Sequence, residues 1–157
     1  MKIYLVRHGI AEERGGAKPD DDRALTGKGK RRTRKAMRGF AKLREVPRLV
    51  LSSPLVRAWE TAVILARVSG ADAPRVETAL APGGDLDAVL ARLRREGRES
   101  VALVGHEPDL STLAERLGAS NVLLRKGAVA RRDGDPEPRQ ARLAWLLQRY
   151  LLRHMAR

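Results

Sequence analysis

Three short apolar runs constrain the fold of this chain more than any other feature of its sequence. They extend from Lys2 to Val6, from Leu49 to Leu51 and from Val101 to Val104. The first and third lack the alternation of polar and apolar residues that marks a half-exposed strand. Continuous runs of this length are typical of strands buried on both faces, as in a parallel sheet covered by helices.

Segments with apolar residues at helical spacing separate these runs and predict amphipathic helices. They extend from Thr26, as N-cap, to a stop at Pro47, from Ser53 or Pro54 through Ala66, from Leu86 to Leu93 and from Leu110 to Leu117. Strands and helices therefore alternate along the chain. This order predicts an α/β domain of three layers, α/β/α, with a mostly parallel central sheet.

Other segments carry weaker signals. Residues 10–26 are polar and predict a surface loop, and the segment from Arg75 to Leu80 is compatible with a strand. Gly127 to Arg131 predicts another strand, and residues 133–138 predict a turn or loop. The tail from Ala141 has both strand-like alternation and helical spacing, so both readings stay open.

The composition bounds the class of protein. A chain of 157 residues without a repeat or linker predicts one domain over residues 1–157. The absence of cysteine excludes a disulfide framework, a thiolate nucleophile and a cysteine-based metal site. The N-terminal apolar run meets Arg7 and His8 too early for a signal peptide, and no apolar stretch approaches the roughly 18 residues of a membrane span. We expect a cytoplasmic protein without a membrane partner.

The net charge of +13 favours anionic partners such as phosphorylated substrates, although a codon bias towards arginine would produce the same surplus. Many cations lie on the polar face of the first predicted helix: Lys28, Lys30, Arg31, Arg32, Arg34, Lys35 and Arg38. No aromatic residues are interleaved with them, and no nucleic-acid-binding motif is present. We therefore interpret this face as solvated and do not expect a nucleic acid partner.

Three polar clusters follow the three apolar runs: Arg7-His8-Gly9, Ser52-Ser53 through Arg57, and Gly105-His106-Glu107. Ligands of open α/β sheets bind outside the carboxyl ends of the strands, so these clusters can converge on one pocket. Guanidinium groups suit phosphate oxygens, and a neutral imidazole can accept a phosphoryl group. From the residues alone, an anion-binding catalytic site and ordinary structural roles are about equally supported.

At these same residues the chain resembles the histidine phosphatase superfamily, which includes the cofactor-dependent phosphoglycerate mutases. Four motifs carry the resemblance in the same order as in that family. They are Tyr4-Leu5-Val6-Arg7-His8-Gly9, Leu25-Thr26-Gly27-Lys28-Gly29, Ser52-Ser53-Pro54-Leu55-Val56-Arg57-Ala58-Trp59-Glu60-Thr61-Ala62 and Val104-Gly105-His106-Glu107-Pro108. They cover residues 1–110 well and the remainder poorly.

Within that superfamily the short chain is similar to the SixA-type branch, which has a minimal form of the phosphoglycerate mutase-like fold. The resemblance implies that His8 is the phosphorylated nucleophile and that Arg7, Arg57 and His106 hold the phosphoryl oxygens. It implies no metal and no organic cofactor. Its expected substrate is a phosphorylated small molecule or a phosphohistidine protein. The three histidines have no metal-site spacing, and His154 is expected at the surface.

The chain departs from many relatives in one respect. They carry an acidic residue, between the second motif and the second histidine, that protonates the leaving group. Here the corresponding segment, from Thr78 to Asp85, offers no clear match, and SixA-type proteins commonly lack that acid. The candidate substitutes are Asp85, Glu12 and Glu13, although solvent-facing roles are expected more often for such residues.

Alternatives to a phosphatase stay open at this point. The missing acid motivates a non-catalytic or very slow phosphate-recognition module, which would bind a phosphorylated partner without turnover. A mutase is disfavoured because the chain has no room for substrate-capping insertions. If His8 attacks as neutral imidazole, activity should fall as pH drops through its pKa, which Arg7 and Arg57 should hold below the usual 6.5.

Overall fold

A computed structural model describes residues 1–136 and 142–157 of the chain. Its six-stranded sheet has the order β3-β2-β4-β1-β5-β6. The strands are β1 (Lys2–Arg7), β2 (Leu49–Ser52), β3 (Arg75–Val76), β4 (Ser100–Gly105), β5 (Val129–Asp133) and β6 (Arg142–Leu147). The pairs β2–β3, β2–β4 and β1–β4 are parallel, and β5 joins β1 and β6 by antiparallel pairing. The predicted α/β class with a mostly parallel sheet is confirmed.

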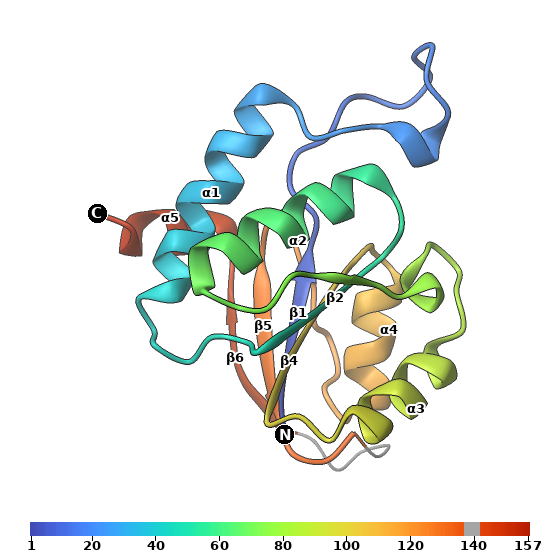
Figure 1. Ribbon diagram of the computed structural model, residues 1–157, viewed down its shortest axis with the longest axis vertical. Helices are drawn as coiled ribbons and strands as arrows, with labels where there is room; N and C mark the ends of the chain where they lie inside the picture. Colours follow the sequence, from blue (N-terminus) through green and yellow to red (C-terminus); the bar gives the residue numbers. More distant parts are fainter. Residues whose placement is uncertain (137–141) are drawn as a thin grey trace.

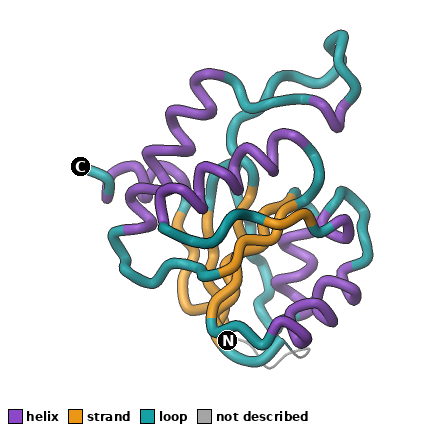
Figure 2. The backbone as a smooth tube through the Cα atoms, viewed as in Figure 1, coloured by secondary structure: helices purple, strands orange, loops and turns teal. Residues whose placement is uncertain are grey.

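Helices cover both faces of this sheet (Figures 1 and 2). One face carries α1 (Gly27–Ala41), α2 (Val56–Ser69) and α5 (Arg149–Met155), and the other carries α3 (Leu86–Glu96) and α4 (Asp109–Arg116). The predicted three layers are therefore present. In the part of the chain that the structure describes, no helix is both long and apolar enough to cross a membrane.

Strand β1 shows why the apolar runs are continuous. Ile3 and Leu5 pack into the core beneath α3 and α4, whereas Tyr4 and Val6 pack into the core beneath α1, α2 and α5. All four side chains are fully buried. A strand between two helical layers needs apolar residues on both faces, because neither face meets water.

The start of α1 agrees with its sequence, and its end does not. The Thr26 hydroxyl accepts a hydrogen bond from the Gly29 N–H at 2.9 Å, as expected of an N-cap. The helix ends at Ala41, before the predicted stop at Pro47. The chain turns at Arg44, which adopts a left-handed φ of 55°, so the helix is broken before the proline is reached.

Two further boundaries differ from the predictions. Helix α2 begins at Val56, later than the predicted opening at Ser53 or Pro54, although the Ser53 hydroxyl accepts the Leu55 N–H. The strand predicted from Arg75 to Leu80 is mostly wrong, because β3 ends at Val76 and a 3₁₀ helix covers Thr78–Leu80. The side chain of Glu77 accepts the Ala79 N–H and draws the chain out of the sheet edge.

The C-terminal tail forms a strand and then a helix, which accounts for both periodicities in its sequence. β6 covers Arg142–Leu147 and α5 follows directly at Arg149, so both signals were real and belonged to different segments. The strand predicted from Gly127 to Arg131 is present as β5, shifted by two residues. Part of the loop predicted at residues 133–138 lies outside the described residues.

Candidate active site

A cavity of about 460 Å³ opens outside the carboxyl ends of β1 and β4. Its walls include all four residues that the motifs singled out, from β1, α2 and the segments that follow β1 and β4. The lining residues are Arg7, His8, Ala11, Glu12, Glu13, Arg14, Arg23, Arg57, Pro82, His106, Glu107 and Lys126. The topology thus brings together side chains that lie about a hundred residues apart in sequence.

The imidazole of His8 has a defined tautomer. Its Nδ1 lies 2.7 Å from the carbonyl oxygen of Gly9, and a carbonyl can only accept, so Nδ1 carries the proton. Nε2 is then the nitrogen with the free lone pair. A Cβ at Gly9 would lie 2.2 Å from the Thr33 hydroxyl, so only glycine fits at this position. The loop after β1 therefore presents a neutral, oriented imidazole.

Burial is the main reason that His8 stays neutral. The side chain is 6% exposed, and its pKa is lowered to about 3, chiefly by desolvation. The carbonyl of Gly9 opposes this shift, whereas electrostatic interactions with His106, Arg57 and Arg7 add to it. The expectation that the two arginines lower this pKa has the right direction, but loss of solvent has the larger effect.

The second histidine lies beside the first. The ring centroids of His8 and His106 are 5.1 Å apart, and His106 is 4% exposed. Its Nε2 lies 2.8 Å from the Ser53 hydroxyl, which already accepts the Leu55 N–H and so has its own proton to donate. Nδ1 would then carry the proton, and it is buried without a hydrogen-bond partner among the described residues. This N–H is available to an oxygen in the pocket.

The pKa of His106 is lowered to about 4, with burial as the largest cause and Arg57 as the second. Both imidazoles are therefore neutral near neutral pH. The positive charge of the pocket comes from guanidinium groups, and the two rings supply one lone pair and one N–H donor.

The two predicted arginines approach from different elements. Arg57 lies in the first turn of α2 and is 1% exposed, and Arg7 ends β1. Burial lowers the pKa of both guanidiniums, which marks them as charges held in a poorly solvated place. Arg7 donates through Nη1 to the Leu124 carbonyl at 2.8 Å, which fixes its direction but leaves other donors free.

Arg57 is engaged by Asp20 from the 10–26 loop. Its Nη1 donates to the backbone carbonyl of Asp20 at 2.7 Å, and its Nη2 donates to the carboxylate at 3.1 Å. The same carboxylate accepts from Nε of Arg23 at 2.8 Å. A carboxylate bound by two guanidiniums occupies the kind of position that phosphate oxygens favour.

Sequence reasoning missed Arg23, Asp20 and Lys126. Arg23 is 8% exposed and lines the cavity, although it lies in a polar loop that was assigned to the surface. The only sequence feature that linked Arg23 to the site was its position two residues before the Leu25-Thr26 motif. Lys126 lies in the region that the motifs covered poorly.

The three candidate acids differ in their positions relative to the cavity and in their hydrogen-bond partners. Asp85 does not line the cavity: it is the N-cap of α3 and accepts the N–H groups of Asp87 and Ala88, which corrects its proposed role. Glu12 lines the cavity, but a hydrogen bond from Lys18 is the main cause of its lowered pKa. A lowered pKa disfavours the protonated form that a general acid needs.

Glu13 is exposed and also lines the cavity. Glu107 lines it too, but both of its carboxylate oxygens are occupied. One accepts the Leu124 N–H at 3.2 Å and the other accepts the Ser111 hydroxyl at 2.6 Å. Glu107 therefore fixes the 122–124 segment against the site.

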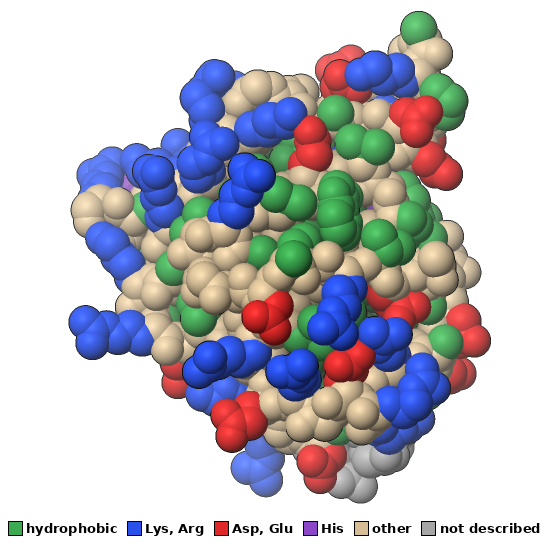
Figure 3. Space-filling view, viewed as in Figure 1, with side chains coloured by type: hydrophobic (Ala, Val, Ile, Leu, Met, Phe, Trp, Pro, Cys, Tyr) green, Lys and Arg blue, Asp and Glu red, His purple; other side chains and the backbone are tan. Residues whose placement is uncertain are grey.

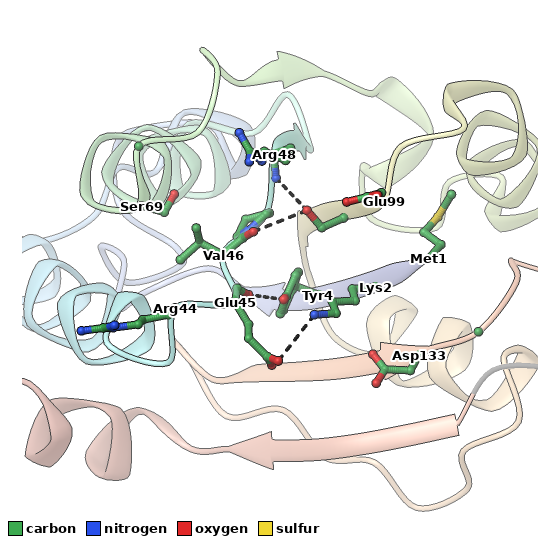
Figure 4. A pocket seen from close by; sticks show the side chains of 14 residues that line it. Met1, Lys2, Tyr4, Arg44, Glu45, Val46, Arg48, Ser69, Glu99 and Asp133 are labelled. Carbon is green, nitrogen blue, oxygen red and sulfur yellow. Dashed lines mark hydrogen bonds and ion pairs between the residues drawn. The ribbon is translucent and has the colours of Figure 1, made fainter.

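A larger cavity of about 590 Å³ lies at the opposite, amino-terminal end of β1 and β4 (Figure 4). Its polar groups mostly bind one another. Lys2 pairs with Glu45 at 3.5 Å, the Tyr4 hydroxyl donates to the Glu45 carbonyl, and Ser100 accepts the Arg48 N–H. No histidine lines it, so we place the chemistry in the smaller cavity. Among the described residues, no group of three His, Cys, Asp or Glu side chains could hold a metal ion.

Comparison with known proteins fits this geometry. Residues 3–83 match the model of the histidine phosphatase superfamily (branch 1), which is more than half of the chain. The chain belongs to the histidine phosphatase superfamily. An uncharacterised protein of Picosynechococcus sp. is 38% identical over 142 residues, which are 85% of this chain and 86% of that protein.

Solved structures place the chain more closely within this superfamily. The protein histidine phosphatase SixA, complexed with tungstate, is 27% identical with a TM-score of 0.85, over 96% of this chain and 98% of that one. A mycobacterial glucosyl-3-phosphoglycerate phosphatase complexed with VO3 has a TM-score of 0.72 at 21% identity, over 92% and 96% of the two chains, and shows the shared fold. The SixA-type resemblance is confirmed, and a phosphatase is supported.

Proposed function

We propose that residues 1–157 form one phosphatase domain in which His8 accepts the phosphoryl group and then releases it to water. One observation carries the proposal: the buried His8 donates its Nδ1 proton to Gly9 and so keeps Nε2 free as a nucleophile. A neutral imidazole with a fixed tautomer can attack phosphorus without first losing a proton.

The reaction has two displacements. Nε2 of His8 forms a bond to phosphorus as the bond to the leaving atom breaks. The leaving atom departs with a proton that was already on the nitrogen of a phosphohistidine or that water donates to the oxygen of an ester. Water then attacks phospho-His8, the P–N bond breaks, the imidazole recovers its lone pair, and the proton of the water leaves with phosphate or solvent. In this proposal the Nδ1–H of His106 and the guanidiniums of Arg7 and Arg57, which all line the cavity, bind the equatorial oxygens, where negative charge is greatest.

Asp20 must release Arg57 when phosphate binds. Its carboxylate is about half exposed in the pair with Arg57, so the exchange replaces a surface carboxylate by a phosphoryl group in the same place. Arg23, released from the same carboxylate, would add a third guanidinium to the phosphate. Because guanidinium groups supply the positive charge around the phosphoryl group, the proposed mechanism needs no metal ion.

The leaving group is the least defined part of the substrate. Of the acids that line the cavity, Glu12 has a lowered pKa, which is the wrong direction for a general acid, and both carboxylate oxygens of Glu107 already accept hydrogen bonds within the protein. A phosphohistidine protein, whose leaving nitrogen can be protonated before it binds, suits such a pocket better than a phosphate ester. We therefore propose phosphohistidine proteins as the first substrate class and small phosphate esters as the second. A cytoplasmic location stays a prediction.

Phosphate release from a panel of substrates tests this function. The panel contains a phosphohistidine protein, p-nitrophenyl phosphate and small phosphate esters, each assayed with EDTA and with vanadate. We expect turnover that resists EDTA and is inhibited by vanadate, with phosphohistidine hydrolysed fastest. Turnover that EDTA removes and added metal restores would contradict the proposal.

The contact between Asp20 and Arg57 favours one other function, a phosphate-recognition module without fast turnover. A pocket closed by its own carboxylate and lacking a poised acid would bind a phosphorylated partner and release it unchanged. A single burst of phosphate with no steady state would support this alternative. Sustained turnover on any member of the panel excludes it.

The pH dependence of kcat/KM should lack an acidic limb at pH 6.5. The pKa of His8 is lowered to about 3, so the free enzyme keeps a neutral nucleophile throughout the range from pH 7.5 to pH 5. The measurement is kcat/KM over that range, corrected for the ionisation of the substrate. A tenfold fall per pH unit beginning near pH 6.5 would show that the nucleophile is an unperturbed histidine and not the buried one.

A further inference from the structure

A second, basic cleft of about 280 Å³ adjoins the phosphoryl pocket. Its lining residues are Ile10, Arg125, Lys126, Gln148, Arg149 and Tyr150. Lys126 also lines the phosphoryl pocket, so the two cavities share a wall. Among the described residues, three cationic side chains and no acidic one line the cleft.

The side chain of Arg149 packs against Gly127, which is hydrogen-bonded to the loop that carries His8. A Cβ at Gly127 would lie 3.1 Å from Cδ of Arg149 and 3.3 Å from Cγ, so the arginine stem lies along the Gly127 backbone. The Gly127 N–H in turn donates to the carbonyls of Arg7 and His8, at 3.1 and 3.0 Å. One residue of backbone therefore separates Arg149 from the nucleophile loop.

The 123–126 segment is fixed to the start of α5 as well. The side chain of Gln148 accepts the Arg125 N–H at 3.2 Å and donates to the Leu123 carbonyl at 2.9 Å. Arg125, Lys126 and Arg149 thus lie on connected backbone and not on independent loops. The fold therefore sets the backbone positions from which these three cationic side chains extend.

These cations repel one another. Burial lowers the pKa of Arg149, and the nearby Arg32 and Arg153 lower it further. Its Nε is buried and has no hydrogen-bond partner among the described residues. Burial lowers the pKa of Lys126 as well, and the positive charges of Arg7, Arg23, Arg14 and Arg149 lower it further. Figure 3 shows Lys and Arg side chains gathered over α1, which packs against α5. Such a cluster is stabilised when an anion enters it.

We propose that this cleft is a subsite for a second anionic group of the substrate, a carboxylate or a phosphate, bound by Arg149 and Lys126 while His8 attacks the phosphoryl group. This inference rests on the proposed function and narrows its substrate class to molecules with two anionic groups. The second anion can come from a small molecule or from an acidic side chain that flanks a phosphohistidine. A cleft of this volume accepts one such group and a few neighbouring atoms.

Binding measurements test the subsite without requiring turnover. Calorimetry compares alkylphosphonates with bisphosphonates that have one to four methylene groups between the phosphorus atoms. We expect one bisphosphonate length to bind at least about tenfold more tightly than its monophosphonate, the scale of one charge-assisted contact. Arg149→Met keeps an unbranched chain against Gly127 and should remove that preference. Arg67→Met, an exposed arginine of α2, is the matched control.

Phosphohistidine peptides with acidic or neutral flanks distinguish the two sources of the anion. Hydrolysis that favours acidic flanks and depends on Arg149 assigns the subsite to a protein substrate, and a bisphosphonate preference alone assigns it to a small molecule. The subsite proposal is wrong if no bisphosphonate binds more tightly than its monophosphonate and acidic flanks are not preferred in hydrolysis. It is also wrong if Arg149→Met retains such a preference. If Arg149→Met does not fold, Lys126→Gln, at the other residue proposed to bind the second anion, replaces it. Tight bisphosphonate binding without turnover on any substrate would contradict the proposed function and leave the subsite standing.

Discussion

Replacing His8 by alanine is expected to abolish phosphate release, with a loss of at least about 10⁴-fold in kcat, the scale expected when a covalent nucleophile is removed. The reason is chemical: in the proposed mechanism no other group can form the bond to phosphorus, because the second ring, His106, has Nε2 turned towards Ser53. Arg7 and Arg57 remain in place, so phosphate should still bind. The assay is steady-state turnover on the best substrate of the panel, with vanadate binding measured in parallel.

His154→Ala is the matched control, because His154 is exposed on α5 and away from the cavity. It should keep full activity. Substantial turnover by a folded His8→Ala protein would contradict the mechanism.

The His8 variant should also change the pH dependence of stability. The pKa of His8 is about 3 in the folded protein and near 6.5 when unfolded, so the unfolded chain binds more protons between these values. The wild type therefore loses folding free energy as pH falls from 6.5 towards 3. His8→Ala lacks this contribution, so its midpoint of thermal unfolding should fall less over the same range.

Arg57→Met is expected to lower kcat/KM by about 10²- to 10³-fold, the cost of losing one preorganised charged donor to the transition state. Arg57 is 1% exposed and extends from the first turn of α2 into the cavity, so no solvent cation can take its place. Methionine fills much of the same volume. The measurement is kcat/KM together with the inhibition constant of vanadate, and both should worsen.

The fold should tolerate this change. The Asp20 carboxylate is about half exposed, so water can solvate it when Arg57 is removed, whereas the buried guanidinium itself carries a desolvation cost. Thermal stability should therefore be unchanged or slightly raised. Arg67→Met makes the same substitution at the exposed end of the same helix and should leave kcat/KM intact. Equal losses in the two variants would show that Arg57 acts only through the fold.

The layers and the grouping of the four motif residues could be predicted because each depends on local pattern. Buried strands such as β1 need apolar residues on both faces, and the loops after parallel strands share one edge of the sheet. Helix ends were less predictable. Pro47 is a strong stop, but the left-handed turn at Arg44 ends α1 first, and no residue type announces that turn.

The rest of the site depends on contacts that have no sequence signature. Asp20 and Arg23 lie in a polar loop, and only the folded chain shows that the Asp20 carboxylate binds both Arg23 and Arg57. Asp85 was a candidate acid because it ends the segment in which many relatives carry one, but it serves as an N-cap, a role that Asp at the start of a helix commonly has. Lys126 and Arg149 lie beyond the recognised motifs.

The most direct test of the central claim is to trap the phosphorylated enzyme. The protein is mixed briefly with labelled substrate, quenched in base, and digested for mass spectrometry under conditions that preserve phosphohistidine. We expect one phosphoryl group on the peptide that contains His8, absent in His8→Ala and present in His154→Ala. Sustained turnover with no phosphoryl group on His8 at any time, or with the label on another residue, would contradict the account.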